Sequence, residues 1–135
     1  MNKEYLDRCK ECRTKGYNCA QAVACAFIDR LPLDEKTVFK AMEGFGGGMG
    51  GADGTCGAIS GAVMVISLLS SNGDCQNTSK HSTYAIVKEL FDSFVKKNGS
   101  SVCKELQGLE TKIALRSCDA CIEDAVLITQ DLLRL

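Results

Sequence analysis

Apolar residues recur every three or four positions along most of the chain, and polar residues occupy the positions between them. This spacing is typical of amphipathic α-helices because it places the apolar side chains on one face. Capping residues precede the apolar runs and glycine or proline follows several of them, which marks the helix ends. The pattern predicts seven helices, at about 3–15, 19–31, 35–42, 56–70, 79–98, 102–107 and 119–133. No alternating pattern predicts a β-strand.

The predicted helix 56–70 is apolar nearly all round, which favours a central, buried position. Gly57 and Gly61 give it a face of small residues that another helix can approach closely. The stretch 44–61 leads into this helix and holds nine of the thirteen glycines, so we expect a backbone that turns sharply and passes close to another group. The fold prediction is an all-α, single-domain bundle of about six or seven helices over 1–135, with this glycine-rich loop before the central buried helix.

We expect capping side chains at the start of most of these helices, since Ser, Thr, Asn and Asp satisfy the free N–H groups there. The predicted caps are Asn18, Asp34, Thr55, Ser117 and either Ser100 or Ser101.

Length, charge and hydropathy narrow the classes of function. A chain of 135 residues is typical of one domain, and its net charge of −1 argues against a nucleic-acid partner or an anionic membrane surface. The charged N-terminus does not resemble a secretory signal. The longest apolar stretch, 58–69, is interrupted by polar residues and is shorter than the ~18 residues of a membrane span. We therefore expect a cytoplasmic protein without direct membrane insertion.

Nine cysteines are unusual for such a protein, because thiols in a reducing compartment more often serve catalysis or metal binding than structural disulfides. Four of them, Cys19, Cys56, Cys103 and Cys118, fall at the start of a predicted helix. The partial positive charge of a helix N-terminus favours a thiolate by about 0.3–1 kcal/mol, and the thiolate is the nucleophile and the metal ligand.

If the four helix starts converge, four neighbouring thiolates would repel one another. The partial positive charges of the helix N-termini are too weak to keep all four ionised against this repulsion. The site would then contain two disulfides or dithiols, or four ligands of a metal or cluster, and four cysteines suit zinc or an iron–sulfur cluster. The intervals of 37, 47 and 15 residues are much longer than the Cys-x-x-Cys spacing of zinc ribbons, which favours a redox or cluster site. Cys56 is the expected reactive thiol.

The other five cysteines have different expected roles. Cys9, Cys12 and Cys25 lie inside helices, where packing is the simpler interpretation, and Cys75 lies in a polar loop as an exposed thiol. Cys121 follows Cys118 by one helical turn and can replace it as a ligand or act as a resolving thiol.

Five stretches spread over nearly the whole chain then suggest a family. They are Gly16-Tyr17-Asn18-Cys19-Ala20-Gln21-Ala22-Val23, Gly44-Phe45-Gly46-Gly47-Gly48-Met49-Gly50, Cys56-Gly57-Ala58-Ile59-Ser60-Gly61-Ala62, Cys103, and Cys118 before Ile122-Glu123-Asp124-Ala125. In this order they resemble the C_GCAxxG_C_C family, which is associated with redox activity. The resemblance implies that the four cysteines of the family name correspond to Cys19, Cys56, Cys103 and Cys118. It also implies a link to membrane transporters, and a similar module in split-Soret cytochromes is associated with an iron–sulfur cluster.

These observations leave three hypotheses. The first is a redox protein that performs thiol/disulfide or electron-transfer chemistry at the four cysteines with a redox partner protein. In it, the backbone N–H groups of Gly47, Gly48, Gly50 and Gly57 surround the sulfurs. The second is a metal- or iron–sulfur-binding module that uses the same four cysteines, or Cys121 in place of Cys118, without catalysis of its own. The third is a structural partner of a membrane transport complex.

Overall fold

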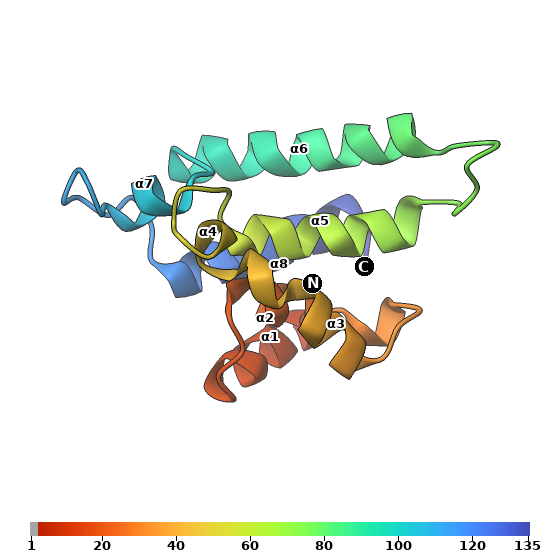
Figure 1. Ribbon diagram of the computed structural model, residues 1–135, viewed down its shortest axis with the longest axis horizontal. Helices are drawn as coiled ribbons and strands as arrows, with labels where there is room; N and C mark the ends of the chain where they lie inside the picture. Colours follow the sequence, from red (N-terminus) through yellow and green to blue (C-terminus); the bar gives the residue numbers. More distant parts are fainter. Residues whose placement is uncertain (1–2) are drawn as a thin grey trace.

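Helices and short helical turns account for most of the computed structural model, which describes residues 3–135 (Figure 1). They are α1 (Glu4–Thr14), α2 (Cys19–Ala26), η1 (Ile28–Arg30), α3 (Glu35–Met42), η2 (Glu43–Phe45), α4 (Gly46–Met49), α5 (Gly57–Ser70), α6 (Lys80–Asn98), α7 (Cys103–Gln107) and α8 (Cys118–Leu132). Apart from α4, a single turn inside the glycine loop, the residues 3–135 form seven α-helices and no strand, which confirms the all-α prediction. The nearest approach to a sheet in this range is one isolated antiparallel bridge between Thr55 and Val102.

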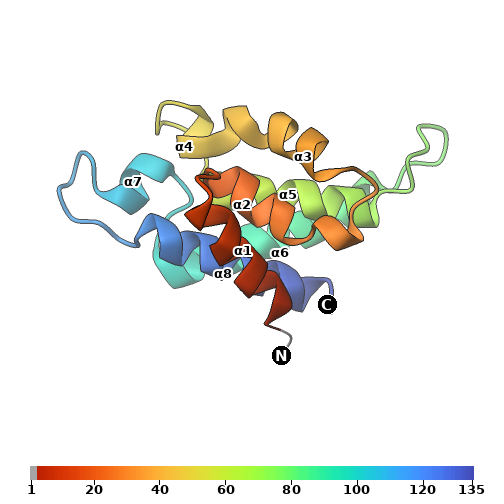
Figure 2. The same ribbon diagram turned by 90° about the horizontal axis from the view of Figure 1, so that it is seen from below.

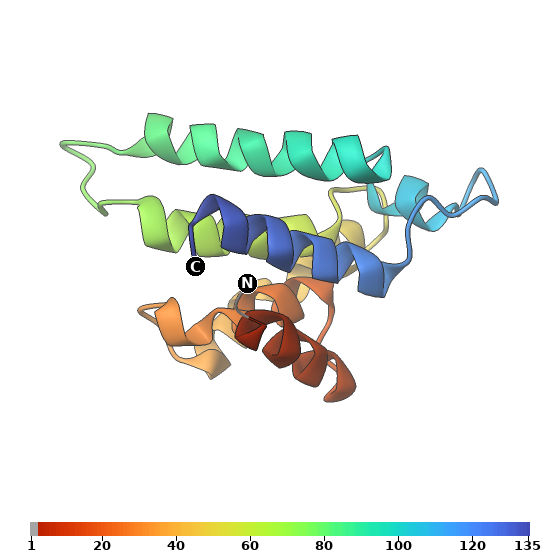
Figure 3. The same ribbon diagram turned by 180° about the vertical axis from the view of Figure 1, so that it is seen from behind.

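The helices are arranged in layers around α2, α5 and α8. Figures 1 and 3 show α6 on one side, α5 and α8 next to it, and α1, α2 and α3 on the far side. α2 packs against α1, α3, α5 and α8, and all eight of its residues are buried. α5 packs against α2, α6 and α8, as expected of a central helix, but one of its faces is only half-buried. No helix within residues 3–135 has the length and hydropathy needed to span a membrane.

α2 and α5 pack closely against each other at the two glycines near the start of α5. A Cβ atom on Gly61 would lie 2.5 Å from the carbonyl oxygen of Ala20, and one on Gly57 would clash with Sγ of Cys19 and with the carbonyl oxygen of Phe45. Side chains larger than hydrogen therefore do not fit at either position. The predicted close approach along this face of small residues is confirmed.

The second helix is shorter than predicted, because α2 ends at Ala26 and not near Leu31. Arg8 of α1 donates a hydrogen bond of 2.7 Å from Nη1 to the carbonyl oxygen of Ala26, and a second one of 3.0 Å to Asp29. The chain then continues as the tighter turn η1. The Arg8 side chain of α1 thus donates to a carbonyl oxygen that, in a longer α2, would accept a hydrogen bond from the helix backbone.

Three of the predicted caps are confirmed and two are wrong. The side chains of Asn18, Asp34 and Ser117 accept hydrogen bonds from the first turns of α2, α3 and α8. The N-cap residues of α5 and α7 are Cys56 and Val102, and no side chain caps either helix by a hydrogen bond. The chain is extended at these two starts because the two segments pair with each other, and this pairing forms part of the site described below.

Candidate functional site

Three backbone hydrogen bonds hold the end of the glycine loop against the segment before α7. The N–H of Cys56 donates to the carbonyl oxygen of Ser101 at 2.7 Å, that of Cys103 to Gly54 at 3.0 Å, and that of Lys104 to Ala52 at 2.9 Å. They bring the start of α5 to the start of α7, although Cys56 and Cys103 are far apart in sequence. Figure 1 shows α4, α7 and the beginning of α5 together at one end of the molecule.

Glycine is required in the loop where it passes Cys103. Gly48 is buried and has φ +65°, and a Cβ atom on it would lie 2.4 Å from Cβ of Cys103. Both its left-handed backbone and this contact exclude a larger residue. Gly48 therefore sets how closely the loop covers α7.

Five cysteines line one cavity of about 160 Å³ at this end of the molecule. They are Cys19, Cys56, Cys103, Cys118 and Cys121. Gly47, Gly57, Arg13 and Arg116 also border the cavity. The structure thus brings the four predicted cysteines to one place, together with Cys121 from the next turn of α8. All five are buried except Cys118, which is half-buried.

Cys19 and Cys118 form a hydrogen-bonded pair. The thiol of Cys118 and the backbone N–H groups of Gly47 and Ala20 stabilise the Cys19 thiolate, and Arg13 adds a positive charge. Together they outweigh burial and lower the pKa of Cys19 from 9.0 to about 6. The same hydrogen bond and burial raise the pKa of Cys118, which retains the shared proton.

Cys56 and Cys121 form a second pair of the same kind. The hydrogen bond from Cys121 and the first-turn N–H groups of Ala58 and Ile59 lower the pKa of Cys56, although burial and the neighbouring Cys19 charge act against them. The pKa of Cys121 is raised by its bond to Cys56 and by burial. In each pair, one sulfur at a helix start holds negative charge and one sulfur on α8 keeps the proton.

Cys103 lines the same cavity but belongs to neither pair. Its Sγ accepts a hydrogen bond of 3.0 Å from Nε2 of Gln107. Burial and the nearby charges of Cys56 and Cys19 nevertheless raise its pKa, so it remains a thiol.

Two arginines border the cavity: Arg116, which is close to Cys118 in the sequence, and Arg13, which sequence reasoning missed. Arg13 on α1 donates to the carbonyl oxygen of Tyr17 at 3.0 Å and to Asp119 at 3.1 Å. Arg116 holds the buried carboxylate of Asp124 with hydrogen bonds of 3.0 and 3.1 Å. Burial alone would raise the pKa of Asp124, but Arg116, Lys97 and Asn98 hold it below its usual value. No signal in the sequence identifies Arg13, because only the packing of α1 brings it to Cys19.

The four glycines predicted to surround the sulfurs do not all lie there. Gly47 and Gly57 line the cavity, and Gly48 touches Cys103. Gly50 is not a lining residue; it ends α4 with φ +79°, and a Cβ atom on it would meet nothing within 4 Å.

The remaining cysteines lie away from this cavity. Cys9, Cys12 and Cys25 are buried in α1 and α2, where burial raises their pKa values to about 12, 11 and 12. They are packed thiols, as predicted. Cys75 is exposed, again as predicted.

Within residues 3–135, no three or more cysteine, histidine, aspartate or glutamate side chains come together as a ligand group. None of the nine cysteines forms a disulfide.

These pKa shifts predict how stability depends on pH under reducing conditions. Cys19 titrates at about 6 in the folded protein and near 9.0 when unperturbed, so its contribution is complete above pH 9 and is lost as the pH falls through 6. The lowered pKa of Cys56 acts in the same direction. We expect the free energy of unfolding in urea with dithiothreitol to rise from pH 6 to pH 8, and to rise less in a Cys19→Ser variant; nearer pH 9, the cysteines with raised pKa values act in the opposite direction. Equal stability at both pH values in the unsubstituted protein would contradict the assignment of the thiolates.

Comparison with known proteins adds one match. The family model “Putative redox-active protein (C_GCAxxG_C_C)” matches residues 17–132. The matched range contains all five cavity cysteines, whereas α1 with Arg13 lies before it. No curated protein and no solved structure matches the chain.

Proposed function

The chain belongs to the C_GCAxxG_C_C family, and on this premise we propose that it is a thiol–disulfide redox protein with two reactive pairs, Cys19–Cys118 and Cys56–Cys121. The observation that carries the proposal is the repeated pairing of a low-pKa sulfur with a proton-holding sulfur in one cavity. A thiolate attacks a disulfide, and a neighbouring thiol resolves the mixed disulfide that forms. Each pair supplies one attacking thiolate and one resolving thiol.

The proposed step needs a disulfide, RSSR′, as the oxidant. The Cys19 thiolate attacks one sulfur of this disulfide, a Cys19–SR bond forms, and R′S⁻ leaves and takes up a proton. Cys118 then loses its proton and attacks the Cys19 sulfur, which forms the Cys19–Cys118 disulfide and releases RS⁻. In total the thiolate–thiol pair loses two electrons and one proton, and RSSR′ takes up these electrons, that proton and one proton from solvent to become RSH and R′SH. Cys56 and Cys121 react in the same way.

The surrounding groups have defined tasks in this step. The N–H groups of Gly47 and Ala20 and the charge of Arg13 stabilise the attacking Cys19 thiolate. The start of α5 does the same for Cys56. Gln107 binds Cys103, which stays protonated and takes no part in either pair.

Disulfide mapping after oxidation tests the proposal. A Cys75→Ser background removes the exposed thiol, and glutathione disulfide serves as RSSR′. Mass spectrometry should find four thiols lost per chain, in the pairs Cys19–Cys118 and Cys56–Cys121. A Cys118→Ser variant should accumulate glutathione on Cys19, because serine keeps the hydrogen bond but cannot resolve the mixed disulfide.

A Cys25→Ala variant is the matched control, since Cys25 is buried outside the cavity and its substitution should leave the pairing unchanged. Disulfides that involve Cys103, or no disulfide at all, would contradict the two-pair proposal. Stoichiometric zinc, or iron with a visible absorption band, in anaerobically purified protein would favour the metal- or cluster-binding alternative. The cytoplasmic location and the link to a membrane transporter stay predictions.

A further inference from the structure

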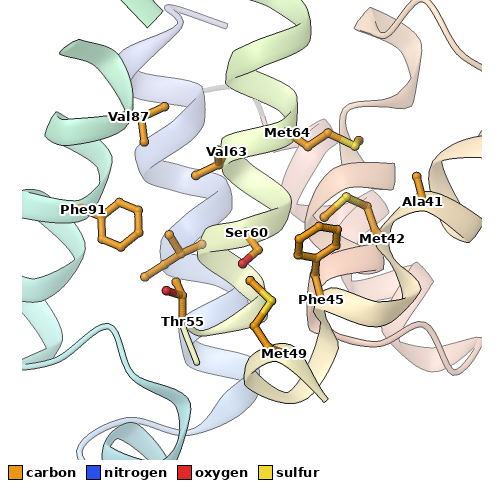
Figure 4. A pocket seen from close by; sticks show the side chains of 11 residues that line it. Ala41, Met42, Phe45, Met49, Thr55, Ser60, Val63, Met64, Val87 and Phe91 are labelled. Carbon is orange, nitrogen blue, oxygen red and sulfur yellow. The ribbon is translucent and has the colours of Figure 1, made fainter. Parts of the chain in front are cut away.

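A second cavity, of about 430 Å³, lies over the half-buried face of α5 (Figure 4). Its walls come from α3, the glycine loop, α5 and α6. Voids inside proteins are rarely larger than a water molecule, whereas small-molecule sites measure roughly 300–1,000 Å³. The size of this cavity is that of a ligand site and not of a packing defect.

The lining is apolar apart from two hydroxyl groups. Among the eleven described residues that line the cavity, none is charged, and only Thr55 and Ser60 are polar. Three of the four methionines of the chain, Met42, Met49 and Met64, lie here. Methionine side chains are flexible and polarisable and adapt to apolar ligands of irregular shape. The lining therefore selects a neutral, mainly apolar molecule.

The two hydroxyl groups offer a polar end to such a molecule. Figure 4 shows Ser60 and Thr55 at the same end of the cavity as Met49. Neither side chain forms a hydrogen bond to any of residues 3–135. A carbonyl or N–H group of a ligand would form hydrogen bonds with these two hydroxyl groups.

The shape of the cavity favours a small molecule over a protein partner. Its floor includes Ile59 and Met42, which are 0% and 2% exposed, whereas Phe45 and Met49 at the glycine loop are 38% and 53% exposed. The apolar surface is therefore recessed behind a rim. Small-molecule sites are concave and mostly apolar in the same way.

We propose that this cavity binds one neutral, largely apolar small molecule, with its hydrogen-bonding end at Ser60 and Thr55. Binding does not require thiol chemistry, because Cys56 faces the other cavity while its neighbour Thr55 lines this one. The glycine loop separates the two sites, with Gly47 on the cysteine side and Phe45 and Met49 on the apolar side.

The test uses the full-length protein and the neutral fluorescent probe N-phenyl-1-naphthylamine. We expect saturable binding of one probe per chain, with a rise in fluorescence. The anionic relative 1-anilinonaphthalene-8-sulfonate should bind at least tenfold more weakly, because no cation lines the cavity. Cys19→Ser protein should bind the neutral probe as well as the unsubstituted chain, which separates this proposal from the redox one.

Variants locate the site. Val63→Phe fills the cavity from α5 and should weaken probe binding at least tenfold, whereas Leu69→Phe, on the same helix but outside the cavity, should change it less than twofold. Ala41→Phe fills the cavity from the exposed side of α3 and serves if Val63→Phe does not fold. Ser60→Ala should weaken binding two- to fivefold.

Three results would overturn the proposal. The first is the absence of saturable probe binding. The second is binding that neither Val63→Phe nor Ala41→Phe weakens. The third is a protein that is dimeric in sedimentation and that Val63→Phe converts to a monomer, because the cavity would then be an interface between copies of the chain.

Discussion

Replacing Gly61 by alanine is expected to lower the free energy of unfolding by about 2–3 kcal/mol, measured by urea denaturation. The new Cβ atom would lie 2.5 Å from the carbonyl oxygen of Ala20 and 3.2 Å from Cβ of Val23. The first contact is with backbone, which cannot rotate away, so α2 must move from α5. The higher helix propensity of alanine offsets only about 1 kcal/mol of this cost.

The same displacement should reach the cysteine cavity, because Cys19 is the neighbour of Ala20 at the start of α2. We expect the Cys19 thiol to titrate at a higher pH in the Gly61→Ala variant. Gly44→Ala is the matched control, since a Cβ atom there meets nothing within 4 Å and Gly44 does not have a left-handed backbone. Equal stability of the Gly61 and Gly44 variants would show that the α2–α5 contact is not as close as the structure has it.

A Cys19→Ser substitution is expected to remove the thiol that titrates at about pH 6. At pH 6.5, oxidation of Cys118 by glutathione disulfide in the Cys75→Ser background should then slow by roughly tenfold or more, because its attacking thiolate is gone, whereas the Cys56–Cys121 pair should still be oxidised. Residue-specific alkylation with iodoacetamide between pH 5 and pH 9, read by mass spectrometry, gives the titration of each cysteine. In the unsubstituted protein the alkylation rate of Cys19 should rise with a midpoint near pH 6.

Cys25→Ala provides the comparison for this experiment, because Cys25 is buried in the same helix and burial raises its pKa to about 12. Its loss should leave the oxidation rate at pH 6.5 unchanged. Unchanged oxidation of Cys118 in the Cys19→Ser variant, or alkylation of Cys19 with a midpoint near pH 9 in the unsubstituted protein, would refute the assignment of Cys19 as an attacking thiolate.

The glycine loop contributes residues to both the cysteine cavity and the apolar cavity. It provides the N–H of Gly47 to the Cys19 sulfur, it covers Cys103 through Gly48, and its end is bonded to the segment before α7. Its other side forms the rim of the apolar cavity through Phe45 and Met49. At Gly48 the left-handed backbone and the close contact with Cys103 occur at the same residue, which requires glycine there.

The sequence by itself determined the helices and the place of each cysteine along them. Apolar periodicity and local caps act within a few residues, so they predicted α2 after Asn18 and α8 after Ser117, with a cysteine as the first residue of each. Where a distant segment supplied the backbone partner, the local signal failed. The starts of α5 and α7 pair with each other, so neither Thr55 nor Ser100 nor Ser101 acts as a side-chain cap.

Only the tertiary structure decided which sulfurs face each other. Cys56 meets Cys121, and Cys19 meets Cys118 near Arg13, because α2, α5 and α8 pack together and α1 packs on α2. The apolar cavity has the same origin, since α3, α5 and α6 leave it open between them. Hydrophobic spacing fixes the face that a helix buries but not the neighbour against which it is buried, and both sites depend on those neighbours.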